Sequence, residues 1–170
     1  MLFLKIIMCI TLFICCYLIG ILISKRYTNR VVQLKDFRNA LNIFKTKIRF
    51  TYEPVPDIFM QIGNNLNNNV GEVFKKASER MKYKTAGYSW EKTIEEKENL
   101  NLTKEDIDIL KNLGKLLGKT DVEGQTSEIE LVESFLDIQI EKSEKEKNRN
   151  EKLYKTLGVV CGLMLVIVLL

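Results

Sequence analysis

An apolar run at each end of the chain limits what this sequence can fold into. At the amino terminus, residues 2–23 are apolar except for Lys5 and Thr11, and a basic pair follows them closely. A membrane-crossing helix needs about 20 apolar residues, each rising about 1.5 Å, so this run is long enough to span. Lys5 lies near one end of it, where its amine can reach the membrane interface. We therefore expect a membrane anchor over residues 1–24.

A cleaved signal peptide is the alternative for this first segment, because such peptides also begin with a positive charge and an apolar run. The apolar run here is longer than the apolar part of a signal peptide. In addition, no A-x-A-like pair of small residues precedes Lys25. The sequence favours the anchor.

The second apolar segment, residues 157–170, is shorter and covers only about 21 Å as a helix. It needs help from snorkelling Lys152 and Lys155 and from Tyr154 at the interface. A buried C-terminal strand is the alternative, since Val and Ile are frequent here. The absence of polar alternation and the charged helical run before it favour a second anchor over residues 151–170.

Lysine and arginine residues cluster beside both apolar segments, which predicts the orientation of the chain. Only Lys5 and the amino terminus oppose a cytoplasmic middle and two outside termini. The net charge of +4 comes largely from these flanks, so it indicates a membrane-lipid surface and not nucleic acid. The flanking cations are Lys25, Arg26, Arg30, Lys35, Arg38, Lys142, Lys145, Lys147, Arg149, Lys152 and Lys155.

Between the anchors, apolar residues recur every three or four positions, which is typical of amphipathic helices. The first helix is expected to continue from the anchor until the two prolines of "EPVP", residues 53–56, end it. Pro56 begins a second helix, which the "GNNLNNN" loop ends, and a third helix covers residues 70–81. A fourth helix is predicted to begin with Ser89 as its N-cap.

Two further helices complete the predicted bundle. Thr103 and Asp106 form a capping box at the start of the fifth, and Gly118 and Asp121 make a tight reversal into the sixth. That last helix is very long, because alternating charges sustain it as a solvated stalk up to the second anchor. Its core stripe is expected to be Ile129, Val132, Phe135, Leu136 and Ile140.

The expected fold is therefore all-α, with no convincing strand pattern anywhere in the chain. It is an antiparallel bundle of about six helices, whose first and last helices lie side by side and extend into the two anchors. The predicted domains are an anchor over residues 1–24, a cytoplasmic helical bundle with a charged stalk over residues 25–150, and an anchor over residues 151–170.

Several stretches give the chain a resemblance to a known family: "LKDFRNALNIFKTKIRFTYEPVPDIFMQI", "GEVFKKASERM", "LTKEDIDILKNLGKLLGKTDVEGQ" and "RNEKLYKTLGVVCGLMLVIVLL". It resembles stage III sporulation protein AB of endospore-forming bacteria. That family in turn is similar to the cytoplasmic helical domain of the inner-membrane platform protein of type II secretion and type IV pilus machines. The match covers essentially the whole chain.

The resemblance implies a place in the mother-cell membrane, within the channel complex that joins mother cell and forespore. It also implies a cytoplasmic hexameric ATPase and other channel-complex proteins as partners. Platform proteins carry two such helical domains and at least three spans, whereas this chain has one domain and two. Self-association into a homo-oligomer is one way to supply the missing copy. The rival hypothesis is an extracytoplasmic helical-bundle sensor that binds a small ligand and signals through the two membrane helices.

Catalysis has little support in the sequence. The chain has no histidine, which excludes an imidazole base and a histidine-ligated metal. The stretch "LGKLLGKT" lacks the spacing of a phosphate-binding loop. We therefore assign no catalytic, cofactor-binding or metal-binding residue. The cysteines, Cys9, Cys15, Cys16 and Cys161, all lie in the apolar segments and are interpreted as small apolar fillers.

Two sets of residues are candidates for partner binding. The first is a basic stripe on the third helix, Lys76, Arg80 and Lys84. The alternative is that this stripe is simply a solvated face. The second is the reversal before the last helix, with Gly114, Gly118, Asp121 and Gln125. The alternative is that the two glycines only allow a close helix crossing and a C-cap. An acidic stripe on the last helix is expected to face solvent: Glu130, Glu133, Asp137, Glu141 and Glu144.

Small residues in the apolar segments are candidates for packing within the membrane. Gly158 and Gly162 form a G-x-x-x-G pattern, which lets another backbone approach closely. They are expected to pack on Cys16 and Gly20 of the first anchor or on another copy of the chain, with simple lipid exposure as the alternative.

Overall fold

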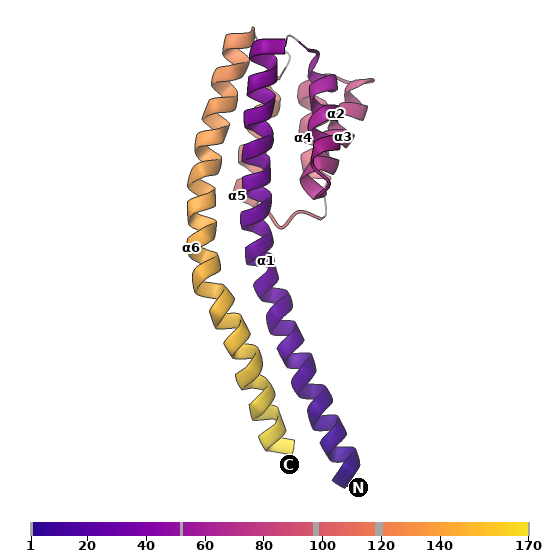
Figure 1. Cartoon of the computed structure of the whole chain (residues 1–170), viewed down its shortest axis with the longest axis vertical. Coiled ribbons are helices and arrows are strands. Elements are labelled where there is room, and N and C mark those ends of the chain that lie inside the picture. The colour runs from indigo at the N-terminus through magenta and orange to yellow at the C-terminus, as the bar shows by residue number, and fades with distance from the viewer. Residues whose placement is uncertain (1, 52, 97–98, 118–120, 170) are drawn as a thin grey trace. The chain divides into compact units, whose positions relative to one another are not determined.

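The structure is a computed structural model that describes residues 2–51, 53–96, 99–117 and 121–169. Within these ranges it contains helices and no strand, which confirms the all-α prediction (Figure 1). The helices are α1 (Leu2–Thr51), α2 (Val55–Asn65), α3 (Asn69–Met81), α4 (Ala86–Glu95), α5 (Lys104–Leu116) and α6 (Val122–Leu169). The described part of the chain therefore has two long helices with four short ones between them in sequence.

Contacts divide the chain into two compact units. Unit 1 combines Met1–Val31 with Lys142–Leu170, and unit 2 is Val32–Glu141. The charged stalk from residue 142 onward thus shares a unit with the apolar segments. The predicted limits of the membrane spans, at residues 24 and 151, stay predictions, because they are defined by where the chain meets a membrane.

An aromatic cluster forms the centre of unit 2. The rings of Phe59 and Phe44 meet edge to face with centroids 4.9 Å apart, and the rings of Phe59 and Phe74 do so at 5.0 Å. Trp90 of α4 is fully buried beside them, and its Nε1 donates a hydrogen bond of 2.7 Å to the carbonyl oxygen of Leu110 on α5. Such tilted arrangements suit the ring quadrupoles, so this cluster holds α1 to α5 around one core.

Local capping explains where several helices begin. The predicted capping box is confirmed: the Thr103 side chain accepts from the Asp106 amide, and the Asp106 carboxylate accepts from the Thr103 amide at 2.8 Å. Asp121 Oδ1 likewise accepts from the Gly124 amide at 3.0 Å at the start of α6. The C-terminal glycine predicted at residue 118 lies outside the described residues.

The predicted start of the fourth helix is wrong. Helix α4 begins at Ala86, after Thr85 in an extended conformation, and Ser89 lies inside the helix with its side chain buried. The reason is a tertiary contact, because Gly87 in the first turn packs directly on the backbone of Gly114 in α5. Because of that contact, the helix begins before Ser89, although serine is a favoured N-cap residue.

The predicted core stripe of α6 is right except for Phe135. Ile129, Val132 and Leu136 are buried and Ile140 packs partly buried against the core, whereas Phe135 is 41% exposed. Successive residues of an α-helix are rotated by about 100°. Leu136 lies at the centre of the buried stripe, so Phe135 lies at its edge. The position of Phe135 leaves an aromatic ring at the surface of unit 2.

The acidic stripe on α6 does not all face solvent, contrary to expectation. Glu133 is buried and accepts from Lys45 of α1 at 2.6 Å. Asp137 accepts from both Nε and Nη2 of Arg38, at 3.1 and 3.4 Å. This hydrogen bonding from Asp137 raises the pKa of Arg38. Part of the stripe therefore joins α6 to α1, and the two long helices lie side by side in unit 2 as predicted (Figure 1).

Candidate functional site

The two apolar segments pack against each other within unit 1. A Cβ placed on Gly20 of α1 would lie 2.7 Å from the carbonyl oxygen of Tyr154 and 3.3 Å from the Cα of Gly158. A Cβ on Gly158 would lie 3.0 Å from the carbonyl oxygen of Cys16. Backbone therefore meets backbone, and a larger residue at either glycine would push the helices apart.

Gly162, the second glycine of the G-x-x-x-G pattern on α6, packs against the ring of Phe13. A Cβ on Gly162 would lie 2.8 Å from Cδ2 of Phe13 and 3.5 Å from the Cβ of Cys16. The structure thus brings together Cys16, Gly20, Gly158 and Gly162, which the sequence had selected for packing. Whether they also contact another copy stays a prediction.

The outer surface of the two apolar segments of unit 1 is apolar. Both helices carry large apolar side chains with a third or more of their surface exposed. Among them are Ile7, Ile10, Ile14, Leu18 and Leu22 on α1 and Leu157, Val160, Leu163, Met164 and Ile167 on α6. Contiguous exposed apolar surface of this kind is rare on proteins in water and typical of membrane contact.

One helix in the described part of the chain, α1 from Ile7 onward, is long and apolar enough to cross a membrane, judged by length and composition alone. This partly supports the predicted pair of anchors. The second anchor, residues 151–170, stays a prediction that rests on its apolar sequence.

Polar contacts follow the apolar packing along unit 1. The rings of Tyr27 and Tyr154 stack with centroids 5.8 Å apart and planes inclined by 17°. The pKa of Tyr27 is raised, mainly by its hydrogen bond with Tyr154. Farther along, Arg30 donates to Glu146 at 2.6 Å, with the Arg30 side chain only 6% exposed. A buried guanidinium needs such a partner, so the pair restricts sliding of α1 against α6 within the unit.

The basic stripe of α3 is only partly available to a partner. Arg80 pairs with Glu96, and this hydrogen bond lowers the pKa of Glu96. Lys76 is exposed on α3, whereas Lys84 is exposed in the turn after α3 ends at Met81, so the predicted stripe does not stay on one helix. The predicted partner role of the stripe therefore rests on these two lysines, and it stays a prediction.

The residues predicted at the reversal before α6 serve packing and capping in unit 2. Gly114 lies against Gly87, and a Cβ on Gly114 would also lie 3.3 Å from Cδ1 of Trp90. Asp121 caps α6, and Gly118 lies outside the described residues. Partner binding by these residues is a prediction that nothing here tests.

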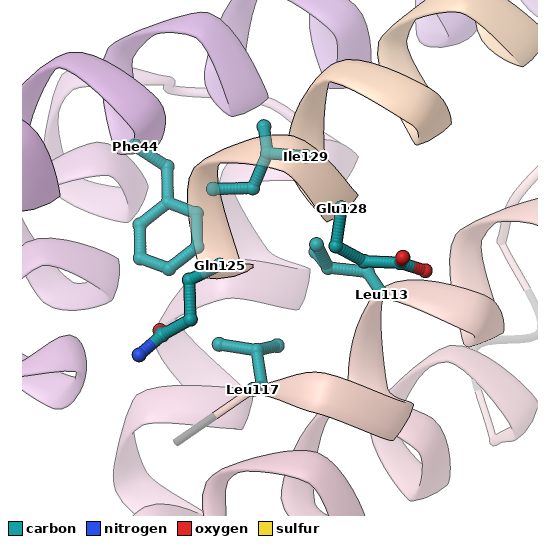
Figure 2. A pocket seen from close by; sticks show the side chains of 6 residues that line it. All are labelled: Phe44, Leu113, Leu117, Gln125, Glu128 and Ile129. Atoms are coloured by element: carbon teal, nitrogen blue, oxygen red, sulfur yellow. The ribbon is translucent and has the colours of Figure 1, made fainter. Parts of the chain in front are cut away.

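Gln125 is half-buried and lines a small cavity (Figure 2). The cavity has a volume of about 10 Å³, which is room for about one water molecule. Its other lining residues are Phe44, Leu113, Leu117, Glu128 and Ile129. The cavity is therefore too small for an organic ligand.

Metal chemistry has no evident site in the described residues, where no group of three or more His, Cys, Asp or Glu side chains could hold an ion. All four cysteines are free thiols, and Cys9 is buried. The carboxylates with the clearest geometry are engaged in ion pairs, such as Glu95 with Lys111 at 2.5 Å.

Comparison with known proteins agrees with these features. The family model described as stage III sporulation protein AB matches residues 5–170, nearly the whole chain. The chain belongs to the stage III sporulation protein AB family. Stage III sporulation protein AB of Bacillus subtilis (strain 168) is 29% identical to it over 154 residues, which are 89% of this chain and 90% of that protein.

A solved structure of a stage III sporulation protein AB has the same fold. It superposes with a TM-score of 0.67 at 24% identity, covering 71% of this chain and 98% of that one. The resemblance to the stage III sporulation protein AB family is therefore confirmed, together with a role in sporulation.

Sequence reasoning missed the ion pairs between α1 and α6. Arg30, Arg38 and Lys45 recur at intervals of eight and seven residues on α1. Their partners Glu146, Asp137 and Glu133 or Glu130 recur in the opposite order on α6. The intervals on α6 are nine residues and then four or seven, so they differ from those on α1 and the sequence alone does not show which charges pair.

Proposed function

We propose that the chain is a membrane-anchored structural adaptor of the sporulation channel between mother cell and forespore. In this role it couples a cytoplasmic ATPase to the membrane complex. Membership of the sporulation family supports the setting. The observation that carries the anchoring is the backbone contact between Gly20 and Gly158, which makes one two-helix unit of both apolar segments.

The long helices support a mechanical role. Helices α1 and α6 each continue without interruption from an apolar segment into the residues of unit 2. Ion pairs link the two helices in each unit, at Arg30 and Glu146 in one and at Lys45 and Glu133 in the other. Each of these helices therefore connects an apolar segment to residues of unit 2 without a non-helical linker, as a role in transmitting force would require.

The proposed location is the mother-cell membrane, with the bundle in the cytoplasm and both termini outside. The cations beside the apolar segments support this orientation. In unit 2 the basic and acidic side chains that remain at the surface are the groups through which an ATPase would bind, since charge complementarity sets association and specificity.

Cysteine labelling tests the orientation. With Ser127→Cys in the full chain, an impermeant maleimide should leave intact sporulating cells unlabelled at this position and label it after permeabilisation. The unsubstituted chain, with its four native cysteines, measures the background. Labelling in intact cells would instead support the extracytoplasmic sensor and contradict the adaptor.

Co-purification tests the partner. The full chain, extracted in mild detergent from sporulating cells, should carry the sporulation ATPase with it. Charge reversal at Lys76 and Lys84 should weaken that association if this surface contributes. Complete absence of the ATPase under conditions that retain other channel proteins would contradict the coupling role.

A further inference from the structure

Three large apolar side chains on α6 face outward from unit 2. Leu131 is 48% exposed and Ile138 is 60% exposed, and Phe135 lies between them, also exposed. Steps of four and three residues put the three on one stripe of the helix, two turns long. Other exposed large apolar side chains of unit 2 lie on other elements: Val32, Phe50, Tyr83 and Tyr88. Single exposed apolar residues are normal on a protein surface, but the three on α6 form a cluster, which indicates an interaction site.

A groove lies beside this stripe, between α5 and α6. It has a volume of about 600 Å³. Phe135 and Ile138 line it from α6, and Ile109 lines it from α5. The polar lining residues are Lys104, Glu105, Asp108, Asn112 and Gln139. We call this the α5–α6 groove; its apolar lining runs along α6 within a polar rim.

The rim of the groove is acidic. Glu105 and Asp108 are exposed on α5, against the single cation Lys104. A surface with this charge repels anionic lipid and attracts a cationic partner.

We propose that the α5–α6 groove binds an amphipathic helix of a partner protein, apolar on one face and flanked there by lysine or arginine. Helices bind in grooves through side chains at i, i+3 or i+4 and i+7, which matches the spacing of Leu131, Phe135 and Ile138. The proposal deepens the adaptor function and rests on it, because it assigns that adaptor a docking surface.

The size of the patch favours a single helix over a second copy of the chain. Globular partners in a stable complex bury roughly 800 Å² each, which three half-exposed side chains and Ile109 do not supply. A short helix needs less area, because a few central apolar anchors provide most of the binding energy.

Site-specific photocrosslinking in sporulating cells tests the occupant. A benzophenone amino acid replaces Leu131 in the full chain, and mass spectrometry identifies the peptide that it captures. We expect a peptide with apolar residues every three or four positions and flanking lysine or arginine. Capture of a second copy, capture of an acidic or non-amphipathic segment, or the absence of any protein adduct would overturn the proposal. The same photoreactive residue at Tyr88, which is also half-exposed, is the control.

A matched set of variants tests the chemistry of the groove. Phe135→Ser with Ile138→Ser, and separately Glu105→Lys with Asp108→Lys, should each lower the yield of the specific adduct at Leu131 by about tenfold or more. Tyr83→Ser with Tyr88→Ser removes exposed aromatic surface elsewhere and should leave the yield unchanged. Unchanged melting temperatures would show that the groove variants are folded, and an undiminished adduct in folded variants would contradict the proposal.

The outcomes separate this proposal from the adaptor function. If the groove variants lose the adduct but Ser127→Cys is labelled in intact cells, the groove binds a helix and the proposed orientation is wrong. If they keep the adduct and the ATPase still co-purifies, the adaptor function stands and the groove assignment fails.

Discussion

Arg30 of α1 donates to Glu146 of α6 over 2.6 Å, from a side chain that is almost entirely buried. This pair lies in the same unit as the glycine contact between the apolar segments. A guanidinium is costly to bury, so its position is defined by where a carboxylate can meet it. The pair therefore sets the register of the two helices along unit 1.

Removing the carboxylate should weaken this register. Glu146→Gln is expected to lower the stability of the full chain by about 1–2 kcal/mol, less than for a fully buried pair because Glu146 is one-third exposed. The melting temperature in detergent measures this. Glu151→Gln, which removes an exposed pair with Lys155 on α6, is the control and should have little effect. Equal effects of the two substitutions would contradict the register role.

The glycines of unit 1 should differ in their tolerance to alanine. Gly20→Ala is expected to cost about 1–3 kcal/mol, because the new methyl group meets a backbone oxygen that cannot turn aside. Gly162→Ala should cost less, since it meets the side chain of Phe13, which can rotate. Melting temperatures of the two variants in detergent check the order, and the reverse order would contradict the packing.

Leucine at Gly158 tests what the glycine pattern joins. Gly158→Leu should separate α1 from α6, which a pair of fluorophores placed on the two helices would detect as reduced energy transfer. Self-association in membranes should also fall if the glycine pattern mediates contact between copies. Unchanged association would restrict the glycine pattern to packing within one chain.

The crossing of α4 and α5 should not accept a side chain at Gly87. Its Cβ would collide with the carbonyl oxygen of Gly114, so Gly87→Ala is expected to destabilise the chain by about 1–3 kcal/mol. Thermal unfolding measures this, with Lys76→Ala on an exposed face as the control. A neutral Gly87→Ala would contradict the close crossing.

Neighbouring residues on α6 should behave in opposite ways. Leu136→Ala removes a fully buried side chain and should cost about 2–5 kcal/mol. Phe135→Ala removes an exposed ring and should cost much less. Similar losses at the two positions, measured by thermal unfolding, would mean that Phe135 is part of the core.

The helices and the capping box of α5 followed from local chemistry, whereas the start of α4 and the ion pairs between helices did not. Thr103 and Asp106 lie three residues apart and carry all the information for their capping box. Ser89 was misread as a cap because the contact of Gly87 with a residue on another helix cannot be seen locally. Phe135 fits the apolar period of α6, and only the position of α5 decides that its ring faces a groove.

Charge shows the same limit. The acidic residues of α6 were recognised as a stripe, yet Glu133 is buried against Lys45 because the two long helices are adjacent. Adjacency was predicted from both helices returning to one membrane, but matching the individual charges needs the register between them. The candidate packing residues Gly20 and Gly158 were found because small residues in an apolar helix have few other uses.

The central claim is that both apolar segments cross the membrane and hold the bundle on its cytoplasmic side. Alkaline phosphatase, which is active only outside the cytoplasm, tests this most directly when fused after residue 150 or after residue 170 in otherwise intact chains. The account predicts background activity for the fusion after residue 150 and high activity for the fusion after residue 170. Background activity from both fusions would mean that the second segment does not cross, and high activity from both would place the bundle outside.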